Sequence, residues 1–230
     1  YTTLFRSLTN AAHQLKTPLA GLRMQADLAQ RDGVSAEDLK HSLLQVGRSS
    51  IRATRTVNQL LALARAEATG REIAKTQINL ERIVMDTVRL VLPQAQDKQM
   101  DLGFDDSPRV RDSTLLGNAI LLQELVRNLL DNALRHSSGA SAPPRVEVQP
   151  LVDGAVQITV RDFGPGVADE QLPNLGQPFF RPDAARTREG GGVGLGLYLC
   201  RLVAQAHGGS FAVRNARPGL EIVVVVPRTK

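Results

Sequence analysis

Two amphipathic stretches joined by a short turn occupy residues 4–64, and they constrain the fold more than any other feature of the sequence. In both stretches, apolar and small residues recur at steps of three and four, as in a helix that buries one stripe. The first stripe comprises Leu4, Leu8, Ala11, Leu15, Leu19, Leu22, Ala26 and Ala29, and the second comprises Leu39, Leu43, Val46, Ser50, Ala53, Val57, Leu60 and Ala64. Between them, Asp32 to Val34 indicate a turn and Ser35 a helix cap. We therefore predict two long antiparallel helices.

Each stripe is narrow and rich in alanine, so a single helical hairpin would leave much of it exposed to water. Packing two hairpins side by side would bury both stripes in a four-helix bundle. We therefore predict that the chain forms a homodimer.

The heptad pattern stops around residues 70–77, which predicts one domain over residues 1–70 and a second over residues 71–230. In the second domain we predict helices over residues 79–96, ending near Pro93, and over 115–136, and strands around 146–148, 156–160, 211–213 and 220–226. The pair Asp153-Gly154 predicts a hairpin turn between the first two strands. A sheet layered against helices in this way gives an α+β sandwich.

The composition is that of a globular chain with a real core, because 42% of the residues are hydrophobic and 22% are charged. The net charge is +5, but the basic residues are scattered and the chain has only six Phe, two Tyr and no Trp, so we expect no nucleic-acid partner. No uncharged stretch is long enough to span a bilayer. The single cysteine, Cys200, is expected to be a buried thiol. Since the chain begins at Tyr1 on a helical pattern, we expect it to be part of a longer protein.

His13 lies two residues before Leu15 of the first stripe, so its imidazole is expected to face solvent. Pro18, in the same predicted helix, removes an amide donor and clashes with the carbonyl of Gln14, at a cost of about 3 kcal/mol. The helix is therefore expected to bend beside His13. Stability alone would not select this proline.

The segment from Ala11 to Leu19, AAHQLKTPL, resembles the phosphoacceptor box of bacterial sensor histidine kinases. The resemblance implies that His13 accepts a phosphoryl group through one ring nitrogen. Gln14 departs from the family, which has an acidic residue there; its amide accepts a hydrogen bond from the ring but takes up no proton at neutral pH. Thr17 matches the position that orients water when these kinases dephosphorylate their partner, which implies a phosphatase activity as well.

A second motif lies in the predicted helix over residues 115–136, where Asn128, Asn132 and Arg135 share the face opposite the apolar stripe. Neutral amide oxygens hold Mg²⁺ without adding negative charge beside a polyphosphate. The motif resembles the asparagine box of the same kinases. The resemblance implies that Asn132 binds Mg²⁺, that Asn128 is a second candidate metal ligand, and that Arg135 and His136 lie by the nucleotide.

Asp162, Gly164 and Gly166 follow a predicted strand, where the glycines permit a tight turn and the carboxylate is held in place. The first glycine box of the family is similar, which implies that Asp162 accepts the amino hydrogen of adenine and so selects it over guanine. The segment PFFRP, which contains Phe180 and Arg181, resembles the phenylalanine box that anchors a mobile lid.

A glycine-rich run then opens a predicted helix that extends past Leu199, and its unobstructed amides suit phosphate binding. It is similar to the second glycine box of the family. The residues implied as nucleotide contacts are Gly190, Gly192, Val193, Gly194, Leu195 and Gly196. Arg186 and Arg188 precede this run in a polar stretch that suits a lid.

The resemblance implies a sensor histidine kinase that uses ATP and Mg²⁺, phosphorylates His13 and then transfers the phosphoryl group to an aspartate of a response regulator. It also implies that the parent protein is an inner-membrane receptor with this portion in the cytoplasm. Two alternatives remain: an ATPase of the gyrase and Hsp90 type, and a scaffold that binds nucleotide without transfer. The ATPases use a glutamate four residues before the metal-binding asparagine, and here that position is Asn128.

Overall fold

The computed structural model describes residues 16, 18–67, 74–98, 100–105, 113–137, 140, 142–182 and 194–228. The chain divides into two compact units, residues 1–61 and residues 62–230. Among the described helices, none combines the length and the apolar character that crossing a membrane requires.

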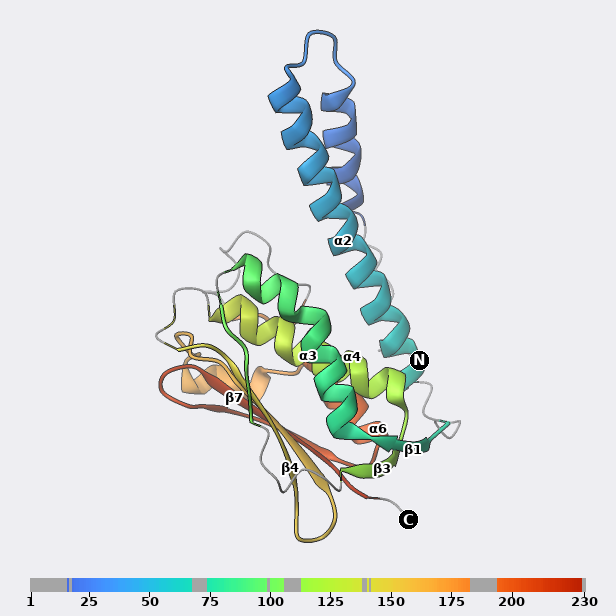
Figure 1. Cartoon of the computed structure of the whole chain (residues 1–230), viewed down its shortest axis with the longest axis vertical. Coiled ribbons are helices and arrows are strands. Elements are labelled where there is room, and N and C mark those ends of the chain that lie inside the picture. The colour runs from blue at the N-terminus through green and yellow to red at the C-terminus, as the bar shows by residue number, and fades with distance from the viewer. Residues whose placement is uncertain are drawn as a thin grey trace. The chain divides into compact units, whose positions relative to one another are not determined.

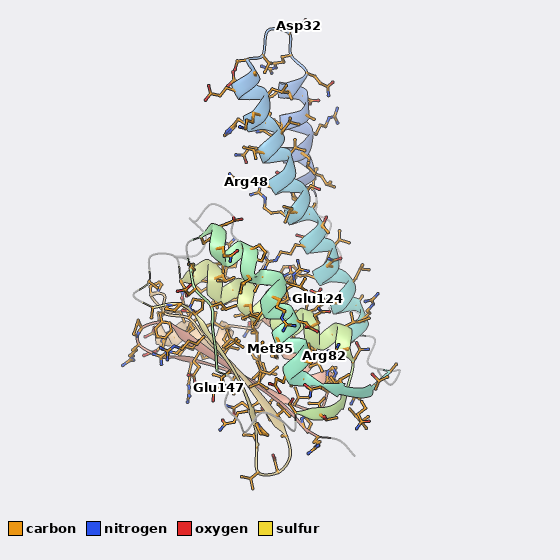
Figure 2. All side chains as sticks on the ribbon, viewed as in Figure 1. Asp32, Arg48, Arg82, Met85, Glu124 and Glu147 are labelled. Atoms are coloured by element: carbon orange, nitrogen blue, oxygen red, sulfur yellow. The ribbon has the colours of Figure 1, made fainter. Side chains whose placement is uncertain are left out.

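The first unit is the predicted helical hairpin (Figure 1). Residues 18–29 are helical, and α2 (Ala36–Glu67) follows after a turn in which Gly33 has a φ of +79°. Asp32 marks this turn in Figure 2. The Ser35 hydroxyl accepts a hydrogen bond from the Asp38 backbone N–H at 3.1 Å and donates one to the Asp38 carboxylate at 2.6 Å. The turn and its cap are therefore as predicted.

Within the first unit, the buried residues of α2 are polar: Ser42, Ser49, Thr56 and Gln59. Ser42, Ser49 and Thr56 are buried and lie seven residues apart, so they form one heptad line. A Cβ atom placed on Gly21 of the first helix would lie 3.7 Å from the Ser49 hydroxyl, which shows that this line faces the first helix. The predicted apolar stripe is therefore not the one that packs inside the hairpin.

The second unit is a five-stranded sheet with helices on one face (Figure 1), which confirms the predicted α+β sandwich. Its elements are β1 (Thr76–Asn79), α3 (Leu80–Asp97), β2 (Gly103–Asp105), β3 (Thr114–Gly117), α4 (Ala119–His136), β4 (Arg145–Pro150), β5 (Val156–Arg161), the 3-10 helix η2 (Asp169–Asn174), α6 (Gly196–Ala206), β6 (Ser210–Asn215) and β7 (Leu220–Val226). The strand order is β2-β4-β5-β7-β6, with β2 parallel to β4 and the other neighbours antiparallel.

The core of this unit lies between α4, α6 and the inner face of the sheet. Alternate residues of β5 and β7 are buried, as half-buried strands require. The fully buried side chains include Leu122, Leu125, Leu129, Leu130, Ile158, Leu199 and Val224. Cys200 is buried as predicted, and its thiol donates to the Leu125 carbonyl at 3.5 Å, which links α6 to α4.

Two helix boundaries differ from the prediction. Leu115 to Gly117 belong to β3, which pairs with β1, and α4 begins only after Asn118, whose side chain accepts from the Leu121 N–H at 3.1 Å. The pairing of Leu115 with Ile78 is a long-range contact that overrides the local helical pattern.

The helix α3 continues past Pro93 to Asp97. The proline removes only one backbone donor, and the extra turn buries Ala95, whose carbonyl accepts from Lys98 and Met100. The predicted bounds, residues 79–96, are therefore confirmed to within one residue at each end, whereas the expected end near Pro93 is wrong.

Candidate functional site

The C-terminal half of α4 carries the predicted asparagine motif. Asn128 is buried, and its side-chain nitrogen donates to the backbone carbonyl of Glu124, one turn earlier in α4, at 2.7 Å. Glu124 is labelled in Figure 2. Asn132 is half-buried and makes no hydrogen bond with a described residue. Arg135 and His136 follow in the last turn, both half-buried. Of the two asparagines, Asn132 thus has the carboxamide that is available to a ligand.

Asp162 lies directly after β5 with 3% of its surface exposed. Its Oδ1 accepts hydrogen bonds from the backbone N–H groups of Gly164 at 3.0 Å and Leu220 at 3.1 Å, and no described residue donates to Oδ2. Burial raises the pKa of this carboxyl above its ordinary value, against the opposing effect of the two amides and Arg161. One oxygen is therefore fixed by the protein, and the other remains an acceptor for a ligand.

The turn after Asp162 packs against the end of α4. A Cβ atom on Gly164 would collide with the carbonyl oxygen of His136, so only glycine fits at this approach. The Phe163 N–H donates to the hydroxyl of Ser137, the C-cap residue of α4, at 3.4 Å. These contacts bring the Asp162 turn and the α4 motif together at one site.

A second junction joins the PFFRP segment to the start of α6. The Phe179 N–H donates to the Gly194 carbonyl at 3.1 Å, and a Cβ atom on Gly194 would lie 2.9 Å from the Phe179 carbonyl carbon. The N-cap residue of α6, Leu195, makes no side-chain hydrogen bond to the first amides of the helix. The positive end of α6, which begins at Gly196, is therefore uncapped by its own side chains.

Six of the predicted site residues lie outside the described residues: His13, Gln14, Thr17, Gly190, Gly192 and Val193. Phe180 and Arg181 are described and are half-buried. The sequence reasoning did not identify Ser137, Asn215 and Gly219, which contact the Asp162 turn. The Pro218-Gly219 pair is typical of a turn before a strand, but the sequence does not show that this turn contacts Asp162.

Two family models match the chain. The "Histidine kinase-, DNA gyrase B-, and HSP90-like ATPase" model matches residues 117–230, and the "His Kinase A (phospho-acceptor) domain" model matches residues 5–69. The chain belongs to the sensor histidine kinase family. The phospho-acceptor domain decides between the histidine kinases and the ATPases that share the nucleotide fold. The predicted family is thereby confirmed.

Curated relatives agree with this assignment. The histidine kinase chain is 36% identical to the sensor protein QseC of Salmonella typhi over 214 residues, and 34% identical to the sensor protein kinase PmrB of Pseudomonas aeruginosa over 230 residues. These matches cover 93% and 98% of this chain but only 45% and 46% of the relatives. The chain thus spans about half the length of the curated relatives that it matches.

Solved structures share the fold of this histidine kinase. A complex of the histidine kinase ThkA with the response regulator TrrA matches 99% of this chain and 63% of its own, with a TM-score of 0.72 and 18% identity. Full-length ShkA in complex with AMPPNP matches 96% of this chain and 45% of its own, with a TM-score of 0.67 and 22% identity.

Proposed function

We propose that this chain transfers the γ-phosphoryl group of ATP to His13 and then to an aspartate of a response regulator. The observation that carries the proposal is the Asp162 carboxylate, which is held by two backbone amides beside the end of α4, in a chain that also has a phospho-acceptor domain over residues 5–69. We take the hairpin domain as residues 1–70 and the ATP-binding domain as residues 71–230.

The free Oδ2 of Asp162 suits the exocyclic amino group of adenine. That amino group donates a hydrogen bond, whereas guanine presents a carbonyl oxygen at the same place, which would face the carboxylate as a second acceptor. The uncapped amides at the start of α6 suit the phosphates, since they combine N–H donors with the positive end of the helix. Gly164 and Gly166 shape the turn that follows Asp162, where Gly166 has a φ of +71°.

The residues of α4 fit a magnesium ion bound to the nucleotide. The Asn132 carboxamide offers a neutral oxygen, the kind of ligand that Mg²⁺ accepts, and no described residue occupies it. Asn128 is the weaker candidate because it is only 5% exposed, whereas Asn132 is half-buried. When bound, the ion would neutralise charge on the phosphates during transfer. Arg135 is placed in the next turn to neutralise further phosphate charge.

In the transfer step, the unprotonated ring nitrogen of His13 attacks the γ-phosphorus, the bond to the bridging oxygen breaks, and ADP leaves. The carboxamide oxygen of Gln14 would accept a hydrogen bond from the other ring nitrogen and so orient the ring. Because an amide takes up no proton, that proton leaves to solvent after the phosphorus–nitrogen bond has formed. Thr17 would orient the water that hydrolyses the aspartyl phosphate of the regulator, which releases inorganic phosphate and restores the aspartate.

The proposed homodimer would cover the apolar stripe of α2. Leu43 is 59% exposed in the single chain, and Leu39 and Val57 of the same stripe are also exposed.

The hairpin also presents Arg23 and Asp27, an exposed ion pair at 4.0 Å, as candidate contacts for the receiver domain of the regulator. From the sensor names of the relatives, we further propose an inner-membrane receptor whose cytoplasmic portion includes this chain.

The proposal is tested by incubating the chain with Mg²⁺ and γ-labelled ATP. We expect an acid-labile, alkali-stable label on the wild-type chain and none on His13→Ala, because a phosphoramidate hydrolyses in acid. Asn132→Ala should remain folded but lose most of the labelling, since it removes the proposed metal ligand. An acid-stable label, or an undiminished one in His13→Ala, would contradict the kinase mechanism.

A further inference from the structure

The side chain of Asn215, the last residue of β6, ties the turn between β6 and β7 to the loop that follows Asp162. The Val167 N–H donates to the Asn215 Oδ1 at 3.2 Å, and the Asn215 Nδ2 donates to the Val167 carbonyl at 2.8 Å and to the Asp169 carboxylate at 2.6 Å. The carboxamide thus pairs with both backbone groups of Val167, as a neighbouring strand would do.

The same turn also fixes Asp162. The Leu220 N–H is one of the two donors to Asp162 Oδ1, and the Asp162 N–H donates to the Leu220 carbonyl at 2.9 Å. Gly219 has a φ of +86° and no room for a Cβ atom, which would collide with the Asp162 carbonyl oxygen. The turn therefore begins at Asn215 and ends at Leu220, whose N–H holds the Asp162 carboxylate in position.

Asn215 lies where the loop and the turn meet. Both segments line an open depression of about 220 Å³, formed by residues 165–169 and by Asn215, Arg217 and Gly219. A Cβ atom on Gly166 of the loop would lie 2.8 Å from Asn215 Oδ1, so the loop and this side chain are in close contact. The two hydrogen bonds to Val167 are partly buried and the bond to Asp169 is exposed, so the carboxamide joins the loop to the turn at the edge of the depression.

We propose that Asn215 is a positioning residue for base selection: it holds the loop and the turn together so that Asp162 Oδ2 is aimed at the amino group of the nucleotide base. The inference rests on the proposed function of Asp162. The Asn215 carboxamide bonds to Val167 and Asp169, so we expect it to act on the preference for adenine only through the carboxylate. Its effect is therefore expected on adenine affinity and not on the affinity for the phosphates.

The test compares the Kd values of ADP and GDP, each with Mg²⁺, on the full chain and on three variants. Arg217→Ala removes an exposed ion pair with Asp169 but none of the Asn215 bonds, Asp169→Ala removes one of them, and Asn215→Ala removes all three. We expect the Kd for ADP to stay near the wild-type value in Arg217→Ala, to rise a fewfold in Asp169→Ala, and to rise about tenfold in Asn215→Ala. The Kd for GDP should change less than about twofold throughout, so the preference for ADP falls in the same order.

The outcomes separate the inference from the function on which it rests. A wild-type chain that binds ADP no better than GDP contradicts the role proposed for Asp162 itself. A wild-type preference that persists unchanged in a folded Asn215→Ala chain, as judged by its thermal transition, overturns the role of Asn215 alone. If Asn215→Ala does not fold, Asp169→Ala decides: hydrogen exchange at the Leu220 and Gly164 amides should accelerate with the loss of ADP preference, and unchanged exchange and preference overturn the proposal.

Discussion

At the scale of single residues, the preference for a base depends on how one buried carboxylate is arranged. Asp162 has one oxygen held by two amides and the other without a described donor. Burial raises the pKa of this carboxyl above its ordinary value, so the fold opposes its charged form. A buried carboxyl group whose pKa is shifted in this way is typical of a site that binds a ligand.

The substitution Asp162→Asn tests this arrangement. The asparagine oxygen could still accept from Gly164 and Leu220, but an NH₂ group would replace Oδ2 and face the amino group of adenine donor to donor. We expect the chain to stay folded, its ADP affinity to fall by at least about tenfold, and its preference to shift toward GDP, whose carbonyl accepts. Calorimetric titration with both nucleotides measures this shift, and an unchanged preference for ADP would show that Asp162 does not read the base.

At the scale of elements, His207 connects the end of α6 to the start of α4. The ring is 1% exposed; its Nδ1 lies 2.8 Å from the Val203 carbonyl and its Nε2 accepts from the Asn118 N–H at 3.0 Å. These two partners require a neutral ring with the proton on Nδ1. Burial lowers the pKa of His207, although the bond to Val203 opposes this effect and nearby Lys75 adds to it.

The folded chain should therefore lose stability as this histidine is protonated. Because the pKa is lower in the folded state than in the unfolded one, the contribution is complete above about pH 6.5 and is lost as the pH falls toward the folded-state value. Urea unfolding between about pH 7.5 and 5.5 should show a steeper loss of free energy for the wild type than for His207→Gln. His41→Gln, which changes an exposed histidine on α2, should keep the wild-type slope. Equal slopes in wild type and His207→Gln would contradict this role.

The elements differ in how far the sequence predicts them. β4, β5 and β7 alternate apolar and polar residues, so each reveals its strand locally. β1, β2 and β3 have three or four residues each, too few to show a period. β3 contains the pair Leu115-Leu116, and α4 has a similar pair, Leu121-Leu122, near its start, so the two elements look alike in the sequence. Residues 114–117 form a strand because they pair with β1, about forty positions earlier in the chain, and this pairing is not visible in the local sequence.

The candidate site shows the same division. Asp162 and Asn132 stand in compact motifs whose spacing is visible along the chain, and the resemblance to the kinase family adds their roles. Asn215 and Ser137 have no such signal, because their partners lie 48 and 26 residues away. Residues that act through tertiary hydrogen bonds become visible only when the fold is known.

At the scale of the whole molecule, the exposed stripe on α2 predicts how two chains associate. Leu43→Glu places a charge in the proposed four-helix bundle and should convert the dimer to a monomer. Leu90→Glu is the matched control, since Leu90 on α3 is 65% exposed and lies in the other unit. Sedimentation equilibrium of the three chains measures the outcome. A wild-type monomer, or a dimer that survives Leu43→Glu and dissociates with Leu90→Glu, would contradict the proposed interface.

The account as a whole requires a phosphoryl group to move from ATP to one particular imidazole. The most direct measurement is mass spectrometry of the chain after incubation with Mg-ATP, with digestion and separation kept at neutral or alkaline pH to preserve phosphohistidine. We predict a single phosphoryl group on the peptide that contains His13, lost on mild acid treatment and absent from His13→Ala. A chain that binds Mg-ATP but acquires no phosphoryl group, or acquires one only on other residues, would contradict the account.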